Sequence, residues 1–214
     1  MKIAIVGAGI SGNTIAHLLH KEHKITVFEK NDRIGGHSHT HNIEIAGKAI
    51  SVDTGFIVFN KKTYPLFTSL LDKLKVDYEH SNMSFSVFSK LSGLEYNGTN
   101  LDTLFSQRKN LFNYKFIKMI FEILRFNKEA LELLIAKEEM TLGDYLVTNN
   151  YSDYFSKHYI LPMGSAIWSS NLKTMLNFPA NFFVKFFHNH GMLNINDRPQ
   201  WLTVTGGSES YVKK

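Results

Sequence analysis

The chain has no cysteine among its 214 residues. This absence excludes disulfides, thiolate metal sites, a cysteine nucleophile and a thioether-linked cofactor, and it fits a reducing, cytoplasmic location. Long apolar runs are also missing, because no stretch of about 18 apolar residues occurs, so no membrane-spanning helix is expected. The N-terminal run "MKIAIVGAGISG" is short and broken by glycines, unlike a signal peptide.

Charge of one sign is nowhere concentrated. The formal net charge is +5, and the lysines are spread along the chain among acidic residues. A nucleic-acid-binding protein usually gathers its positive charge on one face, so no nucleic-acid partner is expected. The hydrophobic content of 43% and the charged content of 20% are ordinary for a globular protein with a sizeable core.

The first thirty residues predict a βαβ unit. "KIAIVG" (residues 2–7) and "KITVFEK" (residues 24–30) read as short buried strands, and "SGNTIAHLLHKE" between them reads as a helix. This order predicts a parallel strand pair with a right-handed crossover. The expected inner face of the helix consists of Ile15, Ala16, Leu18 and Leu19.

Further elements follow from alternation, helical spacing and turn residues. We expect hairpins at residues 39–55 and 83–98, with turns at 46–48 and 91–93. Helices are expected at 63–74, at 110–139 and at 178–191, where Gly191 ends the last one. Pro162 and Gly164 predict an interruption between them. The tail "WLTVTGGSESYVKK" predicts a strand, a turn at Gly206 and Gly207, and the start of a helix.

The motif "GAGISG" is typical of a dinucleotide-binding loop. It follows a predicted strand and opens a predicted helix, and it places Gly7, Gly9 and Gly12 in the G-x-G-x-x-G pattern. These glycines permit the tight turn, the approach of a pyrophosphate and close packing of helix on strand. Glu29, at the end of the second strand, can accept hydrogen bonds from both ribose hydroxyls and would repel a 2′-phosphate.

A second glycine turn distinguishes the dinucleotides. "EKNDRIGGH" matches the pattern E-x-x-x-R-x-G-G, and in this it resembles flavoproteins of the glutathione-reductase-like superfamily, which includes amine oxidases and carotenoid desaturases. The resemblance implies that the turn at Gly35 and Gly36 lies against the pyrophosphate and ribityl chain of FAD. A plain NAD-binding domain, the alternative, has no need of this turn.

The stretch "VDTGFIVFN" resembles the D-x-G turn of the same relatives, which brings backbone close to the flavin ring. Gly55 suits such an approach because it has no Cβ. Asp53 could cap or orient the turn, although Asp53 and Thr54 are also common as plain turn residues. With the resemblance, the candidate cofactor-binding residues are Gly7, Gly9, Ser11, Gly12, Glu29, Lys30, Arg33, Gly35, Gly36, His37, Thr54 and Gly55.

Later stretches are similar to a bacterial group of NAD/FAD-binding proteins in the flavin amine oxidase superfamily. They are "MSFSVFS", "GLEYNGTNL", "LPMGSAIWS", "FFHNHGML" and "RPQWLTVTGGS". The resemblance implies an α/β fold. A Rossmann-like FAD-binding domain would begin in residues 1–80, a largely helical substrate domain would occupy 81–200, and residues 201–214 would return to the first domain.

Members of that superfamily are usually about twice as long, so an N-terminal portion is expected here. Their second half supplies a Gly-Asp cofactor motif and, in amine oxidases, a lysine near the flavin. We therefore name no catalytic residue in this chain.

The histidines allow a metal-site hypothesis. His37, His39 and His41 would share a face on a strand, but no nearby carboxylate or thiol completes a ligand set, so no metal is expected. By the resemblance, His37 is expected near the phosphates. His39 and His41 read as hairpin residues, and the histidines at 17, 20 and 23 read as a solvated helix face.

Residues 113–134 predict a helix that is apolar over most of its surface. Its polar stripe consists of Lys118, Glu122, Arg125, Glu129 and Glu132. Core or cavity packing, peripheral membrane contact and an oligomer interface are all compatible with such a helix. The aromatic segments with Trp168, His188 and His190 are either ordinary core or the wall of a pocket for a small hydrophobic substrate.

The expected function is that of an FAD-dependent oxidoreductase with non-covalent FAD, in which a substrate C–H gives a hydride to flavin N5. One alternative is a flavin-dependent isomerase or mutase, where the flavin returns to its starting redox state. Another is a truncated, non-catalytic nucleotide-binding module.

Overall fold

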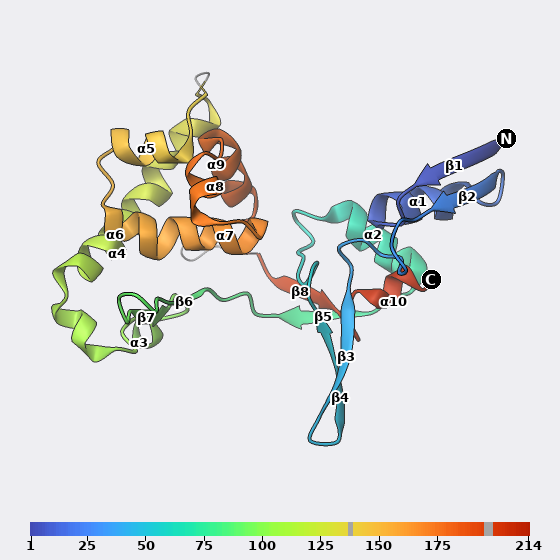
Figure 1. The fold of residues 1–214 in the computed structure, drawn as a ribbon, viewed down its shortest axis with the longest axis horizontal. Helices are drawn as coiled ribbons and strands as arrows, with labels where there is room; N and C mark the ends of the chain where they lie inside the picture. Colours follow the sequence, from blue (N-terminus) through green and yellow to red (C-terminus); the bar gives the residue numbers. More distant parts are fainter. Residues whose placement is uncertain (137–138, 195–198) are drawn as a thin grey trace. The chain divides into compact units, whose positions relative to one another are not determined.

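A computed structural model describes residues 1–136, 139–194 and 199–214 (Figure 1). The chain forms two compact units, one made of Met1–Met83 with Gln200–Lys214 and the other of Ser84–Pro199. The second unit is therefore inserted into the first. Two parts of the sequence predictions lie outside the described residues. They are residues 137–138 of the helix predicted at 110–139 and residue 198, the first of the stretch "RPQWLTVTGGS". The assignment of these units to a cofactor and a substrate stays a prediction.

The predicted βαβ unit is present at the start of the first unit. Strand β1 (Lys2–Val6) pairs in parallel with β2 (Lys24–Phe28), and helix α1 (Ile10–Leu19) connects them. The register runs from Lys2 opposite Lys24 to Val6 opposite Phe28. This pairing brings the end of β1 and the end of β2 together, where the glycine loop begins.

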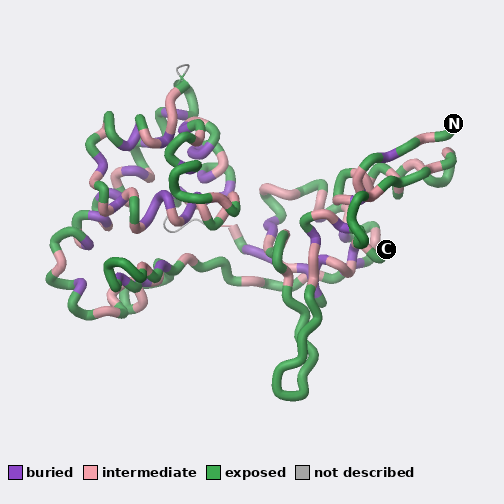
Figure 2. Tube along the Cα trace, viewed as in Figure 1, coloured by how far each residue is buried: buried purple, intermediate pink, exposed green. Residues whose placement is uncertain are grey.

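The predicted burial of this unit is wrong. Figure 2 shows this part of the chain mostly in the exposed and intermediate colours. Only Ile5 of the two strands is buried, while Val6 and Phe28 are exposed, and Ile15 and Leu18 of α1 are 47% and 62% exposed. Apolar strands of this kind are buried when layers cover both faces of the sheet. In the described part of the chain, β1 and β2 contact mainly each other and α1, so most of their apolar surface stays open.

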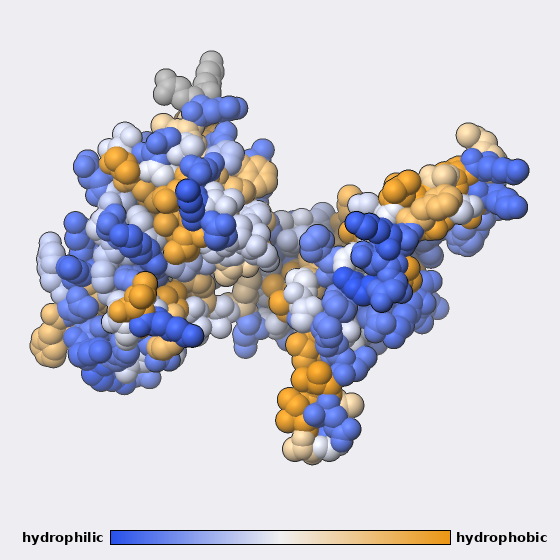
Figure 3. Space-filling view, in the orientation of Figure 1, coloured by the Kyte–Doolittle hydropathy of each residue, from blue (hydrophilic) through white to orange (hydrophobic). Residues whose placement is uncertain are grey.

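A long hairpin follows, as predicted. Strand β3 (Thr40–Ile45) pairs with β4 (Lys48–Asp53), and the two turn residues Ala46 and Gly47 both have positive φ, at 51° and 76°. Such a turn matches the twist of the flanking strands. One face of the hairpin carries four exposed apolar side chains, visible in Figure 3: Ile43, Ile45, Ile50 and Val52.

The rest of the first unit encloses a small core. Helix α2 (Pro65–Leu74) begins with proline at its first turn, strand β5 (Tyr78–Ser81) pairs antiparallel with β8 (Trp201–Val204), and α10 (Glu209–Val212) follows. The buried residues of this core are Phe59, Leu71, Val76, Leu202, Val204 and Tyr211. The tail thus forms the predicted strand and short helix.

The second unit is mostly helical. Its hairpin joins β6 (Ser86–Phe88) to β7 (Glu95–Asn97). Its helices are α3 (Leu101–Leu104), the 3-10 turns η1 (Arg108–Phe112) and η2 (Ala130–Leu134), α4 (Tyr114–Glu129), α5 (Leu142–Thr148), α6 (Asp153–Phe155), α7 (Leu161–Trp168), α8 (Leu172–Leu176) and α9 (Ala180–Asn189). Aromatic side chains dominate its core, among them Phe116, Phe126, Phe155, Phe183 and Phe187. In residues 1–136, 139–194 and 199–214, no helix is both long and apolar enough to cross a membrane.

The interruption predicted at Pro162 and Gly164 is wrong, because the helix runs from α6 into α7 without a break. A π turn, η3 (Ser156–Ile160), joins them. Pro162 has no N–H to donate to the carbonyl of His158, its partner in a regular α-helical turn. The Tyr96 hydroxyl donates to that carbonyl instead, at 2.7 Å. Gly164 lets α7 approach α8 and α9, since a Cβ there would lie 2.8 Å from the Met175 sulfur.

Replacing Tyr96 by phenylalanine tests this role of the hydroxyl. Tyr96 is 2% exposed, and burial, assisted by Tyr159 and Tyr154, raises its pKa, so the hydroxyl stays a donor. Loss of this hydrogen bond from a buried hydroxyl costs about 1–3 kcal/mol, and we expect Tyr96→Phe to lower the free energy of unfolding by that amount in urea titrations. Tyr114→Phe, at a 77% exposed position, is the control. Equal stability of the two variants would contradict the role assigned to Tyr96.

The polar stripe of α4 is only partly a solvated face, because Lys118 and Glu129 are exposed whereas Glu122 is buried. Glu122 is 4% exposed and accepts hydrogen bonds from the backbone N–H of Ser152 at 2.8 Å and from its hydroxyl at 2.5 Å. Arg125 lies 4.0 Å over the ring of Tyr151 and donates to the carbonyl of Asn149 at 3.0 Å. The stripe therefore binds the segment that connects α5 to α6.

Candidate functional site

The first glycine loop joins β1 to α1. At two of its positions, the backbone conformation or the packing requires glycine. Gly7 has φ of +93°, a backbone conformation that favours glycine. A Cβ on Gly12 would lie 2.0 Å from the Gly7 carbonyl oxygen, so only glycine allows α1 to pack this closely on the loop. The backbone N–H of Gly7 donates to Phe28 at 2.7 Å and ties the loop to β2.

Gly9 differs from its two neighbours. Its φ is −77°, and a Cβ there would meet nothing closer than the Cα of Gly36 at 3.9 Å. Gly9 is also the N-cap residue of α1, a position that favours Ser, Thr, Asp or Asn, yet no side chain caps this helix. The fold therefore does not require glycine here, and its effect is to leave the helix N-terminus open, with N–H groups and the positive dipole end available to an anion.

Glu29 lies beneath this loop. One carboxylate oxygen accepts from the Ala8 N–H at 2.8 Å, and the other accepts from the backbone and side chain of Asn31 at 2.9 and 3.1 Å. The backbone N–H of Asn31, followed by that of Ala8, holds the pKa of Glu29 below its usual value. The carboxylate is therefore charged at neutral pH, and its remaining lone pairs can accept hydroxyl donors.

The second glycine turn lies directly on the first loop. The N–H of Gly35 donates to the Ala8 carbonyl at 2.7 Å, and a Cβ on Gly36 would lie 3.0 Å from the Cα of Gly9. Gly35 and Gly36 both have positive φ, at 111° and 61°. Arg33 braces this turn by donating to the Gly36 carbonyl at 2.8 Å. Its guanidinium is thus engaged with backbone, a role that sequence reasoning did not assign to it.

The third segment, Thr54 and Gly55, pairs with the residues after the glycine turn. The Thr54 N–H donates to His39, and the Phe56 N–H donates to His37, both at 3.0 Å. A Cβ on Gly55 would lie 2.0 Å from the His37 carbonyl oxygen. Three glycine segments that are distant in the sequence therefore meet backbone to backbone. Of the other candidate residues, Ser11 lies exposed in the first turn of α1 and Lys30 lies exposed after β2.

The histidines after the turn lie close together. The rings of His39 and His41 have centroids 4.1 Å apart. Partial burial, followed by the positive charges of Arg33 and His41, lowers the pKa of His39, which is therefore neutral at pH 7. His37 is exposed. Within the described residues, no group of three or more His, Asp or Glu side chains could hold a metal ion.

Sequence reasoning missed one residue of the loop, Asn13. Its side-chain amide donates to the Ala8 carbonyl at 3.0 Å, and Ala8 is 1% exposed. Ala8 thus receives the Asn13 amide and the Gly35 N–H on its carbonyl while donating to Glu29. The sequence feature that could have pointed to Asn13 is its position one helical turn after Gly9.

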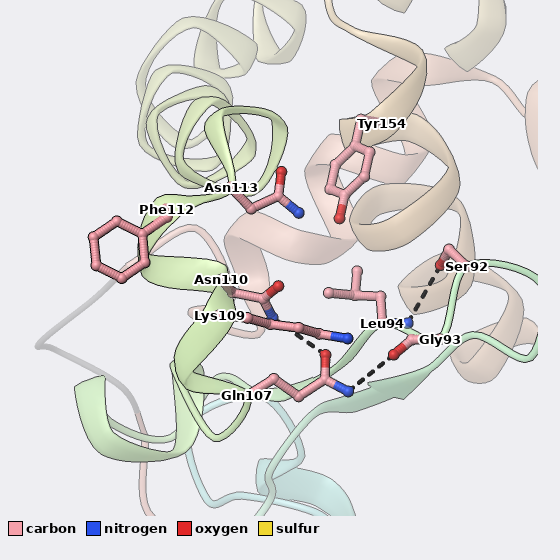
Figure 4. Close-up of a pocket in the computed structure, with 9 residues that line it drawn as sticks. All are labelled: Ser92, Gly93, Leu94, Gln107, Lys109, Asn110, Phe112, Asn113 and Tyr154. Atoms are coloured by element: carbon pink, nitrogen blue, oxygen red, sulfur yellow. Dashed lines mark hydrogen bonds between the residues drawn. The ribbon is translucent and has the colours of Figure 1, made fainter.

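Each unit has a cavity among its described residues. A groove of about 350 Å³ lies among α1, α2 and α10 and includes His17, Leu70 and Tyr211. The other, of about 330 Å³, lies in the helical unit (Figure 4). Several of its polar groups bond to one another: the Gln107 amide donates to Gly93 at 2.9 Å and accepts from Asn110 at 3.4 Å. This network joins the β6–β7 turn to η1.

Trp168 and His190, two of the three aromatic and histidine candidates of the second unit, pack against its core. Trp168 contacts Phe178 and Phe186, each with ring centroids 4.8 Å apart. His190 is 7% exposed, stacks on Phe186 at 3.9 Å and hydrogen-bonds its carbonyl. His188 is exposed. These positions favour ordinary core packing for Trp168 and His190.

Comparison with known proteins agrees with this geometry. Residues 5–74 match the family model of the NAD(P)-binding Rossmann-like domain. A stretch of 55 residues is 40% identical to the flavin-dependent L-tryptophan oxidase RebO of Lentzea aerocolonigenes, covering 25% of this chain and 12% of that protein. Both glycine loops lie within residues 5–74, the part that matches the Rossmann-like family model.

Solved structures extend the likeness to the second unit. Cyclohexylamine oxidase from Brevibacterium oxydans aligns with a TM-score of 0.65 and 16% identity over 99% of this chain. A triple mutant of putrescine oxidase aligns with a TM-score of 0.63 and 21% identity, again over 99% of this chain. The chain therefore shares the fold of the aligned part of these two amine oxidases. It spans about half the length of these amine oxidases, 48% in both cases.

Proposed function

We propose that this chain is the FAD-binding part of a flavin-dependent oxidoreductase of the amine oxidase type, acting on a small molecule. The observation that carries the proposal is the contrast between Gly9 and its neighbours. Gly7 and Gly12 are glycines for reasons of conformation and packing, whereas Gly9 has neither reason. A pyrophosphate can approach a helix N-terminus closely only if the residue there has no side chain, and Gly9 meets this requirement.

The residues around Gly9 fit the rest of the cofactor. Glu29 offers a charged carboxylate to the ribose hydroxyls, and the N–H groups at the start of α1 suit the pyrophosphate. The contact between Gly36 and Gly9 and the close approach of Gly55 to the His37 carbonyl join these segments through backbone rather than through side chains. Such a surface suits an extended dinucleotide, whose long linker needs room beyond one glycine loop.

In this proposal, FAD held by these residues would supply the acceptor, at flavin N5, for a hydride from a substrate C–H. The protein residues bind and orient. Glu29 fixes the ribose, the start of α1 balances the pyrophosphate charge, and Arg33 keeps the second turn closed by holding the Gly36 carbonyl. The comparisons with putrescine oxidase and cyclohexylamine oxidase support a small-molecule substrate by analogy of fold.

Binding of dinucleotides to the purified chain tests the proposal. FAD, FMN, NAD and ADP-ribose are titrated separately, and binding is followed by calorimetry and, for FAD and FMN, by flavin fluorescence. We expect FAD to bind most tightly and FMN, which lacks the adenosine part, not to bind. Preference for NAD over FAD, or no binding of any of the four, would overturn the proposal.

The variant Glu29→Gln separates charge from shape in this site. A neutral amide makes weaker hydrogen bonds than a carboxylate, and we expect FAD affinity to fall about tenfold or more at pH 7. Because the folded-state pKa of Glu29 is lowered, its charge persists below the ordinary glutamate range. Wild-type affinity should therefore hold as the pH falls through that range and decline only below it, whereas the variant should show no such decline. Glu22→Gln, on an exposed residue after α1, is the control.

A further inference from the structure

The carboxylate of Asp53 bonds to Ser208, a residue 155 positions further along the chain. Asp53 ends β4, and both its oxygens accept from the backbone N–H of Ser208, at 3.0 and 2.9 Å. The Ser208 hydroxyl donates to the same carboxylate at 2.8 Å, and the Thr40 hydroxyl donates at 2.5 Å. Ser208 is 1% exposed, so this contact is shielded from water.

Thr40 extends the contact to the next residue of the tail. Its hydroxyl oxygen accepts from the backbone N–H of Glu209 at 3.0 Å while donating to Asp53. Gly207 packs on the same side chain, because a Cβ there would lie 2.4 Å from the Thr40 methyl carbon. Asp53 and Thr40 together thus satisfy the two N–H groups at the start of α10.

A second hydrogen bond joins the same two parts of the chain. The hydroxyls of Ser38 and Tyr211 bond to each other, and both residues are buried. Ser38 follows the glycine turn and Tyr211 belongs to α10. The tail therefore bonds both to Ser38, the residue after His37, and to Asp53, two residues before Gly55.

The position of Asp53 connects this attachment to the candidate site. Its neighbours Thr54 and Gly55 form the third glycine segment, and the Thr54 N–H pairs with His39. A plain turn residue would bond to backbone within its own turn. The hydrogen bonds found for Asp53 in the described part of the chain run instead to Thr40 and Ser208.

We propose that Asp53 is a positioning residue that holds the Thr54–Gly55 segment in place by binding Ser208 and Thr40. Residues 205–212 then belong to the support of the cofactor site. Asp53 acts through backbone geometry and makes no contact with the cofactor itself. The inference rests on the proposed binding of FAD by these glycine segments.

The variant Asp53→Asn is the test, since it preserves size but places an amide where one oxygen accepted the Ser208 N–H. Two measurements are made on the full chain. Hydrogen exchange without cofactor should show faster exchange of the Ser208 and Glu209 amides. FAD titration should show affinity lowered about ten- to a hundredfold, with altered visible absorption bands of the bound flavin. Ser208→Ala, which removes only the hydroxyl bond, should give smaller effects of the same kind.

The control is Ser51→Ala, on the same strand and on the same face as Asp53. It removes the hydrogen bond from Ser51 to Asn42 at 2.8 Å, which has no link to the tail. We expect wild-type exchange and wild-type FAD affinity from it. Unchanged FAD affinity and spectrum in Asp53→Asn, while exchange at Ser208 rises, would overturn the inference and leave the proposed function intact. Absence of FAD binding by the wild type would overturn the proposed function, whatever the exchange data show.

Discussion

Gly9→Ser is expected to abolish retention of FAD without loss of stability. Serine fits the backbone at this position, where φ is −77° and the nearest atom to a new Cβ lies 3.9 Å away. As an N-cap residue, serine is preferred over glycine by a few tenths of a kcal/mol, so Tm should be equal or slightly higher. The hydroxymethyl group would occupy the space above the helix N-terminus, and we expect FAD affinity to fall by about a hundredfold or more.

Gly12→Ala is the matched comparison within the same motif. Its Cβ would lie 2.0 Å from the Gly7 carbonyl oxygen, so the loop and α1 have to separate. We expect this variant to lose thermal stability together with FAD affinity, in contrast to Gly9→Ser. The measurements are thermal unfolding without FAD and fluorescence titration with FAD. Wild-type FAD affinity in Gly9→Ser would contradict the proposal that the pyrophosphate of FAD approaches the backbone at Gly9, because the described structure gives that glycine no other role.

Glu122→Ala is expected to have the largest effect on folding in the helical unit. It removes the buried acceptor of two hydrogen bonds and leaves the half-buried N–H and hydroxyl of Ser152 without this partner. Each unsatisfied group costs about 1–3 kcal/mol, so we expect a loss of about 3 kcal/mol or more in the free energy of unfolding. Urea denaturation followed by tryptophan fluorescence measures it, since Trp168 lies in this unit.

Glu129→Ala controls for the removal of a carboxylate from the same helix. Glu129 is exposed, pairs with Arg125 at 3.5 Å and accepts from the Tyr151 hydroxyl at 3.2 Å. Exposed ion pairs contribute about 1 kcal/mol or less, so this variant should unfold at nearly the wild-type urea concentration. Similar losses in both variants would contradict the distinction drawn between the buried and the exposed carboxylate.

Local patterns predicted the elements that local physics determines. Alternation with a glycine-containing turn located the β3–β4 hairpin, and the turn residues Ala46 and Gly47 have the positive φ that such a turn requires. The glycine spacing located the loop between β1 and α1. In both cases the information lies within a few adjacent residues, so no knowledge of distant neighbours was needed.

Burial and long-range contacts were not predictable in this way. The apolar pattern of α1 marks Ile15 and Leu18 as suited to burial, but burial depends on which elements cover them. The helical spacing of Glu122 placed it in a polar stripe, but the donors on Ser152 come from another segment. Pro162 breaks a regular helix, yet a wider turn accommodates it with help from the distant Tyr96.

The candidate site was likewise predictable only in its local features. Its glycines were recognisable from spacing, whereas the bonds that position them came only from the structure. Arg33 holds the Gly36 carbonyl, Asn13 holds Ala8, and Asp53 holds Ser208. Each of these contacts joins a side chain to the backbone of another segment, and a single sequence carries no record of which backbone group that is.

The insertion of Ser84–Pro199 between β5 and β8 has a consequence for the order in which the chain folds. The inserted unit is continuous, so all its partners have left the ribosome once Pro199 has emerged, and domains generally fold as units during synthesis. The unit that begins at Met1 must wait for Trp201–Val204 to pair with β5 and for Ser208 to reach Asp53. The first residues of the chain to be synthesised therefore gain these contacts only after the insert has been made, and prior folding of the insert shortens the loop that the pairing has to close.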